Sequence, residues 1–93
     1  MNKKNLTVKE TFFLALQNQK KNNFKVAEKL YKEILKTNPN HFQSAYLLGL
    51  LSLQTKNLEQ AKQLFDKALK INPNHADTHN NLGLVFKELG ETQ

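Results

Sequence analysis

The sequence predicts an all-α protein assembled from tandem helix–turn–helix units. The tetrapeptide Asn-Pro-Asn-His occupies residues 38–41 and recurs unchanged at residues 72–75, 34 positions later. Self-similarity at a fixed period of roughly 20 to 50 residues is typical of repeat arrays. Between these motifs, apolar side chains recur with the spacing of about 3.6 residues that marks an amphipathic helix. We therefore divide the chain into a flexible tail and one domain, with the boundaries 1–7 for the tail, 8–93 for the domain, and 8–41, 42–75 and 76–93 for two repeats and a half repeat.

The first repeat is predicted to contain two helices. Thr7 followed by Glu10 fits a capping box, so a first helix is expected over residues 8–21. Asn22-Asn23 then ends this helix, because asparagine tolerates the left-handed backbone conformation that closes helices. A second helix is expected over residues 24–37, where the apolar residues follow the helical period.

The two prolines set the boundaries of the remaining helices. Each proline moves the residue before it out of the helical region. Asn40, with Gln43 three residues later, and Asn74, with Asp77, are expected to cap the helices that follow. The expected helices are 42–55, 58–71 and 76–89, with a turn at Lys56-Asn57, a stop at Pro73 and a C-terminal turn at Gly90.

Small residues are predicted to bring the two helices of a repeat close together. Gly49 and Ala61 fall on facing helices of the second repeat, where a residue without bulk lets the backbones approach. Phe65 and Leu48 are expected to fill the space beside them. In the first repeat the same parts are assigned to Ala15 and Ala27.

The composition excludes several classes of function. The 93 residues contain no cysteine, which rules out disulfides, thiolate catalysis and cysteine metal sites. No apolar run is long enough to span a bilayer, and no secretory core follows the basic first residues, so a cytoplasmic protein without a membrane partner is expected. All 14 basic residues are lysines, and the formal net charge of +6 is uneven along the chain. Residues 1–41 carry +6, residues 42–75 carry +2 and residues 76–93 carry −2.

The repeats resemble the tetratricopeptide repeat family, whose motif is W-x2-L-G-x2-Y, then A-x3-F, then P, at a period of about 34 residues. The second repeat reads Ala45-x2-Leu48-Gly49-x2-Ser52, then Ala61-x3-Phe65, then Pro73. The resemblance covers residues 8–93, although the leading aromatic residue is absent from all three repeats. Its signature positions are Leu14, Ala15, Ala27, Tyr31, Pro39, Leu48, Gly49, Ala61, Phe65, Ala68, Pro73, Leu82 and Gly83.

The resemblance implies a right-handed α-solenoid whose first helices line a concave face. That face is expected to bind a peptide or protein segment, with no catalysis, cofactor or small-molecule substrate. Tyr46 is favoured as a contact residue because aromatic side chains with a polar tip are enriched at interfaces. Each leucine of the face can equally serve to pack neighbouring first helices together. The residues expected to line or border the concave face are Phe12, Leu16, Gln19, Tyr46, Leu47, Leu50, Leu53, Asn80, Asn81 and Leu84.

Two specialised binding modes of the family are poorly matched. Among the positions that clamp a partner's carboxylate, only Asn81 has a suitable side chain, and Asp77 would repel the ligand. The asparagine ladder that grips a partner's backbone in O-linked sugar transferases has one candidate rung, at Asn81, and Asn80 or Asn81 can equally be solvated. The alternative function is an N-terminal targeting or assembly region of a larger bacterial glycosyl-, sulfo- or methyltransferase.

A lysine stripe on the second helix is a candidate anion site. Such a stripe attracts phosphate, but no arginine is present for bidentate contacts, so nucleic acid is not the expected partner. Pairing of Glu28 with Lys32 favours a solvated outer face instead. The stripe consists of Lys25, Lys29, Lys32 and Lys36.

A metal site is considered at His75 and His79, which lie four residues apart with Asp77 between them. His75 falls in the loop before the helix, and its copy His41 has no such companion. We therefore predict no metal site.

The third repeat lacks its second helix, which residues after Gln93 are expected to supply in a longer protein. A terminal repeat without a polar cover leaves apolar surface in water. Such a surface favours a homodimer through the fifth helix, because removing apolar area from water stabilises association. The residues expected to be partly uncovered, and to form the self-association surface, are Leu82, Val85, Phe86 and Leu89.

Overall fold

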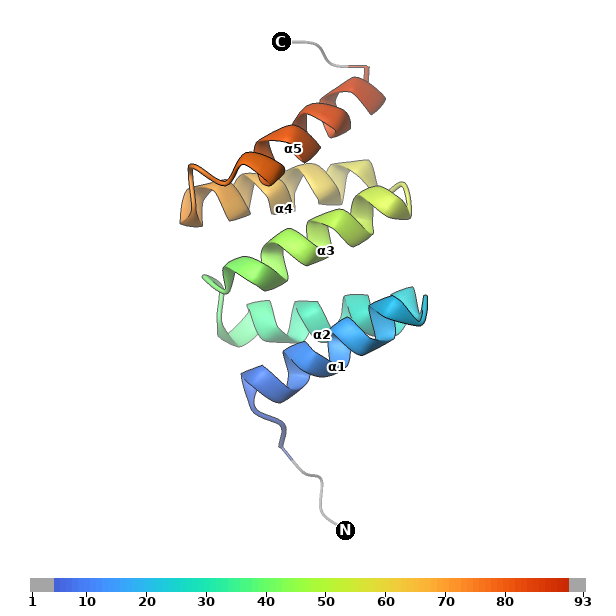
Figure 1. Cartoon of the computed structure of the whole chain (residues 1–93), viewed down its shortest axis with the longest axis vertical. Helices are drawn as coiled ribbons and strands as arrows, with labels where there is room; N and C mark the ends of the chain where they lie inside the picture. Colours follow the sequence, from blue (N-terminus) through green and yellow to red (C-terminus); the bar gives the residue numbers. More distant parts are fainter. Residues whose placement is uncertain (1–4, 91–93) are drawn as a thin grey trace.

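The computed structural model describes residues 5–90, so the ends of the predicted tail and of the predicted half repeat lie outside the described residues. Within 5–90 the chain contains helices and no strand, and the helices stack one after another into an elongated body (Figure 1). The predicted all-α helical-repeat fold is confirmed. The helices are α1 (Val8–Lys20), α2 (Phe24–Thr37), α3 (Phe42–Gln54), α4 (Leu58–Ile71) and α5 (Ala76–Glu88).

The helix boundaries repeat with the sequence. The first helices of the three repeats begin at residues 8, 42 and 76, and the second helices begin at residues 24 and 58. The first helices end one residue earlier than predicted, at 20, 54 and 88. The residues predicted as their last are the C-caps, whose N–H groups still donate to helical carbonyls. The difference is therefore the ordinary fraying of a helix end.

The turns inside the repeats use the left-handed conformation. Asn22 has φ 65° and Lys56 has φ 66°, and in both turns the next asparagine N–H closes the helix by donating to a carbonyl five residues back. Asparagine adopts this conformation readily, whereas lysine does so at a steric cost. Gly90, with φ 78°, makes the predicted C-terminal turn.

The N-caps correct one prediction. The capping box at Thr7 and Glu10 forms as predicted, with both hydrogen bonds present. The caps of α3 and α5 are not Asn40 and Asn74 but the histidines that follow them. Nδ1 of His41 accepts from the N–H of Ser44, and Nδ1 of His75 accepts from the N–H of Thr78, each at 3.2 Å. The asparagines lie in the turn, one residue too early to reach the first free N–H groups of the helix.

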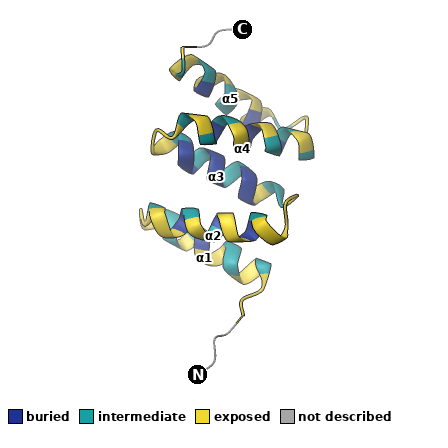
Figure 2. Cartoon of the chain, turned by 180° about the vertical axis from the view of Figure 1, so that it is seen from behind, coloured by how far each residue is buried: buried dark blue, intermediate teal, exposed yellow. Residues whose placement is uncertain are grey.

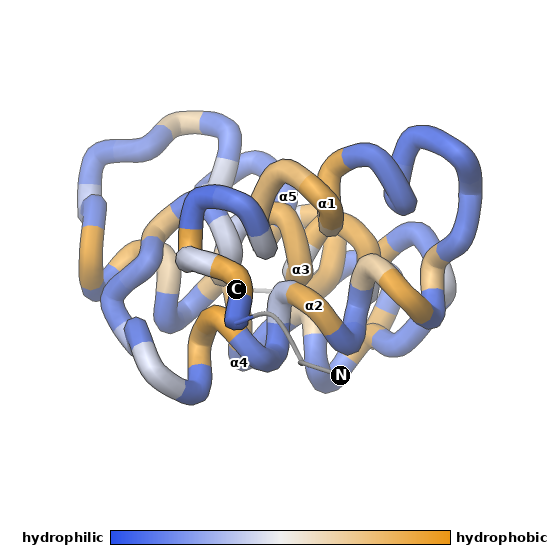
Figure 3. The backbone as a smooth tube through the Cα atoms, turned by 90° about the horizontal axis from the view of Figure 1, so that it is seen from below, coloured by the Kyte–Doolittle hydropathy of each residue, from blue (hydrophilic) through white to orange (hydrophobic). Residues whose placement is uncertain are grey.

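The core is centred on α3, which packs between α2 on one side and α4 on the other (Figure 2). Its buried residues are Ser44, Ala45, Leu48, Gly49, Leu51 and Ser52. Viewed along the stack, apolar stretches of the helices gather toward the middle and the turns at the sides are hydrophilic (Figure 3). The exposed outer faces of α2 and α4 explain why these helices are strongly amphipathic.

The predicted close contact at Gly49 is confirmed, and its partner is an aromatic ring. A Cβ atom added at Gly49 would lie 2.6 Å from the ring of Phe65. Ala61, predicted to face Gly49 directly, packs in the same buried cluster with Phe65 and Val85. In the first repeat the corresponding cluster contains Ala15, Ala27 and Tyr31. The small residue in each first helix thus makes room for the aromatic ring of the second.

Candidate protein-binding surface

The helices form two rows, with α1, α3 and α5 on one side of the molecule and α2 and α4 on the other (Figures 1 and 2). On α1, side chains spaced by three or four residues share a face. We call this surface, with its counterparts one and two repeats later, the first-helix face. On α1 it consists of Lys9, Phe12, Phe13, Leu16 and Lys20.

An open apolar depression lies on the α1 part of the first-helix face. Its volume is about 390 Å³, and it is lined by Lys9, Glu10, Phe12, Phe13 and Leu16. Phe13 is 61 % exposed, although it is a large aromatic side chain. Phe13 is not among the residues that were predicted to line the concave face, although it lies on the first-helix face. Its position, four residues from Lys9 and three from Leu16, was the signal that could have identified it.

Tyr46 lies in the middle of the face but is held mainly by its own chain. Its ring stacks on Phe42 at a centroid distance of 6.0 Å and meets His75 at 4.9 Å and Phe65 at 6.1 Å. Its hydroxyl accepts a hydrogen bond from Asn81 Nδ2 at 3.5 Å. Burial raises the pKa of Tyr46, and the nearby Asp77 carboxylate raises it further. Tyr46 is therefore a structural residue whose polar tip reaches the surface.

An aromatic–histidine cluster, which was not predicted from the sequence, recurs in the two complete repeats. In the first repeat, Phe12 meets Tyr31 at 6.1 Å and His41 at 5.2 Å. Tyr46, Phe65 and His75 are the 34-residue copies of these three residues. The histidine ring of each cluster also caps the next helix. The conserved spacing of His41 and His75 in the repeated tetrapeptide was the only sequence signal.

The leucines predicted to line the face are divided between the core and the surface. Leu47 packs against the first core cluster, and Leu50 and Leu53 pack against the second. Each of them is half-buried, so part of each side chain remains at the surface. Leu16 is also half-buried, whereas Leu84 is 50 % exposed. Leu47, Leu50 and Leu53 therefore pack against the core, and part of each side chain also belongs to the surface.

The predicted polar residues of the face differ in how they are engaged. Gln19 accepts a hydrogen bond from the hydroxyl of Tyr31 at 2.6 Å, which links α1 to α2. Asn81 Nδ2 donates to the carbonyl of Asp77 at 2.8 Å in addition to Tyr46. Asn80 is exposed to solvent.

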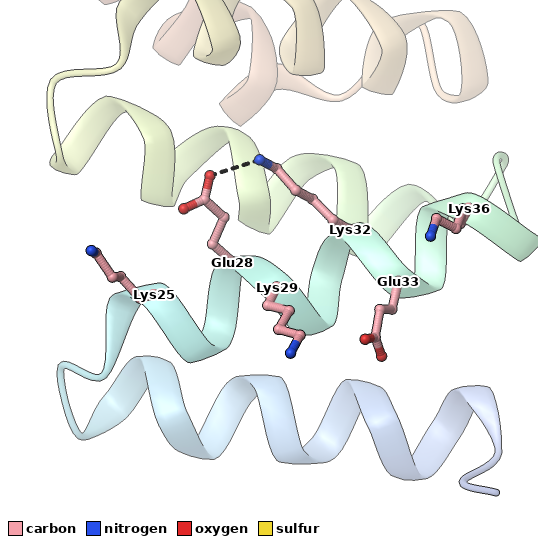
Figure 4. A pocket seen from close by; sticks show the side chains of 6 residues that line it. All are labelled: Lys25, Glu28, Lys29, Lys32, Glu33 and Lys36. Atoms are coloured by element: carbon pink, nitrogen blue, oxygen red, sulfur yellow. Dashed lines mark ion pairs between the residues drawn. The ribbon is translucent and has the colours of Figure 1, made fainter.

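The lysine stripe covers the outer face of α2, away from the first-helix face. Lys25, Glu28, Lys29, Lys32, Glu33 and Lys36 project from this helix around a shallow, open depression (Figure 4). The predicted ion pair forms, with Lys32 Nζ 2.9 Å from Glu28 Oε2. The hydrogen bond from Lys32 holds the pKa of Glu28 below its usual value, while burial acts in the opposite sense.

The two C-terminal histidines are engaged with the backbone and a hydroxyl. His75 Nδ1 lies 2.8 Å from Thr78 Oγ1, and His79 Nε2 lies 2.7 Å from the carbonyl oxygen of Pro73. Over residues 5–90, no group of three or more His, Cys, Asp or Glu side chains is arranged to hold a metal ion. No helix in the same range is long and apolar enough to cross a membrane.

The outer side of α5 is only partly as predicted. Leu82, Phe86 and Leu89 are half-buried, but Val85 is fully buried. The expectation that Val85 is uncovered is therefore wrong, because it faces α4 and packs with Phe65. Beside it, a Cβ atom added at Gly83 would meet no atom within 4 Å. The space that Phe65 fills at the equivalent Gly49 is open at Gly83.

Comparison with known proteins adds the family and the fold. A model described as "Tetratricopeptide repeat" matches residues 19–91. A crystal structure of MamA superposes with a TM-score of 0.87 at 18 % identity, covering 90 % of this chain and 49 % of that chain. A structure titled MamA AMB-1 gives 0.85 at 23 % identity, covering 90 % and 46 %. No curated protein matches the chain.

The likeness to MamA concerns the fold, since fewer than a quarter of the residues are identical and the chain spans about half the length of those proteins. The family match covers most of the chain. In the structure, the repeat motif accounts for the repeated helix boundaries and for the contact of Phe65 with Gly49. The chain belongs to the tetratricopeptide repeat family.

Proposed function

We propose that this protein is an interaction module that binds a peptide or protein segment on its first-helix face. The observation that carries this proposal is the open depression on α1, where Phe13 stays 61 % exposed beside Phe12 and Leu16. Exposed aromatic side chains on a pre-formed surface are typical anchors of protein interfaces. The face continues over the half-buried Leu50 of α3 to Leu84, which is 50 % exposed, on α5.

The proposal is tested by selecting binders from a displayed library of random peptides. Selected peptides should lose most of their affinity for the Phe13→Glu and Leu84→Glu variants, since each places a charge at an exposed apolar contact. Val26→Glu is the matched control, because Val26 is an equally exposed apolar residue (46 %) on α2. Binders that are insensitive to the first two variants, or that depend on Val26, would move the binding surface elsewhere.

A homodimer through α5 is proposed as a second property. The open space at Gly83 and the half-buried Leu82, Phe86 and Leu89 support it. Burying apolar surface contributes roughly 25 cal/mol per Å², against association costs of several kcal/mol, so the dimer is expected to be weak. Sedimentation should show it at millimolar concentration, and Phe86→Glu should abolish it. A chain that stays monomeric at that concentration contradicts this property and leaves peptide binding intact.

A further inference from the structure

The first-helix face changes in hydropathy from α1 to α5. Because the first helices recur at a 34-residue offset, equivalent positions can be compared directly along the stack. Phe12 is followed by Tyr46 and then by Asn80, and the neighbouring position Phe13 is followed by Leu47 and Asn81. A third position, Leu16, Leu50 and Leu84, stays apolar throughout. The face is therefore aromatic and apolar over α1 and rich in amide groups over α5.

The charges of the same face change in the same direction. Lys9 of α1 is replaced by Gln43 in α3 and by Asp77 in α5. One further position, three turns along each helix, runs from Lys20 through Gln54 to Glu88. All six side chains are exposed. At each of these two positions the formal charge thus changes from positive on α1, through neutral on α3, to negative on α5.

The other charges beside the face reduce this gradient without removing it. Glu10 lies next to Lys9, but its carboxylate is turned back to cap the N–H of Thr7 at 2.9 Å. Glu88 is paired with Lys56 at 3.2 Å, and Lys87 is exposed beside it, so these three charges sum to +1 and the C-terminal end of α5 adds nothing to the gradient. The gradient therefore rests on Lys9 and Lys20 at α1 and on Asp77 at α5. The field of Asp77 reaches the face, since it contributes to the raised pKa of the Tyr46 hydroxyl.

We propose that the first-helix face is a polarised groove that holds its partner segment in one orientation. The segment has large apolar side chains next to carboxylates at the end that lies over α1. Its other end, over α5, is basic and presents backbone groups to Asn80 and Asn81. This inference deepens the proposed function and rests on it, because it specifies the chemistry of the segment that the face binds.

The width of the face limits the length of the segment. The first helices of successive repeats contact one another little and pack chiefly on the second helices. Three of them therefore span more than the roughly 20 Å that direct packing at about 8–10 Å would give. An extended peptide advances about 3.3 Å per residue, so more than about six residues cross the face. This length is enough to carry an acidic apolar end and a basic polar end at once.

A pair of peptides with the same composition tests the orientation. The first probe is Glu-Glu-Leu-Leu-Ser-Gly-Lys-Lys, and the second, Lys-Lys-Leu-Leu-Ser-Gly-Glu-Glu, exchanges the charges around the same leucines. Because the leucines favour the α1–α3 side, the second probe cannot satisfy the charges by turning round. The first probe should bind about fivefold to tenfold more tightly at low salt, and the ratio should shrink as salt screens the charges.

A charge-exchange variant of the protein gives the decisive comparison. In the Lys9→Glu, Lys20→Glu, Asp77→Lys variant, the second probe should become the preferred one. The Lys29→Glu, Lys36→Glu, Asp66→Lys variant is the matched control, since these residues are exposed on the outer helices and the net charge changes by the same amount, and it should leave the preference unchanged. Circular dichroism establishes that each variant is folded before binding is measured.

The outcomes separate this inference from the proposed function. Equal affinities for the two probes, a preference that survives the charge exchange in the protein, or failure of both probes to bind at millimolar concentration would each overturn the polarised groove. Peptides from the random library that depend on Phe13 and Leu84 would still support binding at the first-helix face in those cases. A library without such binders would remove the proposed function as well.

Discussion

At the scale of single residues, repeat-equivalent positions act as internal controls for one another. Gly49 and Gly83 occupy the same place in successive repeats, yet only Gly49 has a ring against it. Tyr31 and Phe65 are likewise equivalent, yet only Tyr31 has a hydroxyl, which donates to Gln19. The contribution of each side chain to the free energy of unfolding therefore depends on which groups of the neighbouring helix contact it.

The two glycines should respond oppositely to alanine. Gly49→Ala should destabilise the fold by about 1–3 kcal/mol, because the new Cβ atom overlaps the Phe65 ring inside a packed core. Gly83→Ala should stabilise it by up to about 1 kcal/mol, since alanine favours the helix and meets nothing within 4 Å. Urea denaturation of both variants measures the difference. Equal effects would show that the ring of Phe65 does not lie over Gly49.

The raised pKa of Tyr31 predicts how the free energy of unfolding changes at high pH. Burial raises the pKa of Tyr31 to about 12, above its ordinary value of 10.0. Below pH 10 the tyrosine is neutral in both states, and its contribution is fully present. As the pH rises from 10 to 12, the unfolded chain loses the proton first, and about 2–3 kcal/mol of stability is lost.

Tyr31→Phe tests this loss. At pH 8 the variant should be less stable than the parent by about 0.5–1.5 kcal/mol, because the hydrogen bond to Gln19 is gone. At pH 11.5 the gap should narrow or reverse, since phenylalanine does not titrate. All other ionisable groups are common to the two proteins and cancel in the comparison. A gap that is independent of pH contradicts the burial of the Tyr31 hydroxyl.

At the scale of helices, the histidine caps join one repeat to the next. His41 and His75 each accept a hydrogen bond from an N–H group of the following helix, while their rings pack on an aromatic residue in the first helix of the preceding repeat. An Nδ1 atom that accepts a hydrogen bond carries no proton, so the imidazole is held in one tautomer. The start of each new helix is thereby fixed to the aromatic cluster below it.

Replacing the cap of α5 separates these two contributions. His75→Ala removes both the cap and the ring contacts with Phe42 and Tyr46, and should cost about 1–2 kcal/mol. His75→Asn keeps a capping side chain and should recover part of the loss. Asn80→Ala is the control, because Asn80 is exposed on the same helix. Thermal melts that rank all three variants together would show that His75 does not cap α5.

At the scale of the whole molecule, the helices in the middle of the stack are expected to be the most stable. In repeat proteins each element is stabilised mainly by its nearest neighbours. α3 packs against α2 and α4, whereas α5 packs mainly against α4 and only slightly against α3. The described part of α5 also contributes only Thr78 and Val85 to the buried interior.

Hydrogen exchange should therefore reveal a gradient of protection along the stack. Amides in the middle of α3, near Leu48 and Leu51, should be the slowest to exchange, and those of α5 among the fastest of any helix. At millimolar protein concentration the protection of α5 should rise if the proposed dimer forms. Protection of α5 equal to that of α3 in dilute solution would contradict the nearest-neighbour description.

The sequence alone determined the number, order and boundaries of the helices to within one residue. These features depend on local physics: the apolar period, the restriction imposed by Pro39 and Pro73, and the left-handed turn at Asn22. The 34-residue period also identified Gly49 as a close contact and Tyr31 and Phe65 as core residues, because a repeated unit must bury the same positions each time.

Only the tertiary structure decided which side chains of different helices contact one another. The caps depend on where the imidazoles of His41 and His75 come to rest, and the burial of Val85 depends on how α4 crosses α5. The exposure of Phe13 likewise follows from its place in an open depression on α1, which the neighbouring α2 does not cover. Such contacts join residues far apart in the chain, and the period of a sequence specifies the face of a helix but not the side chain that approaches it.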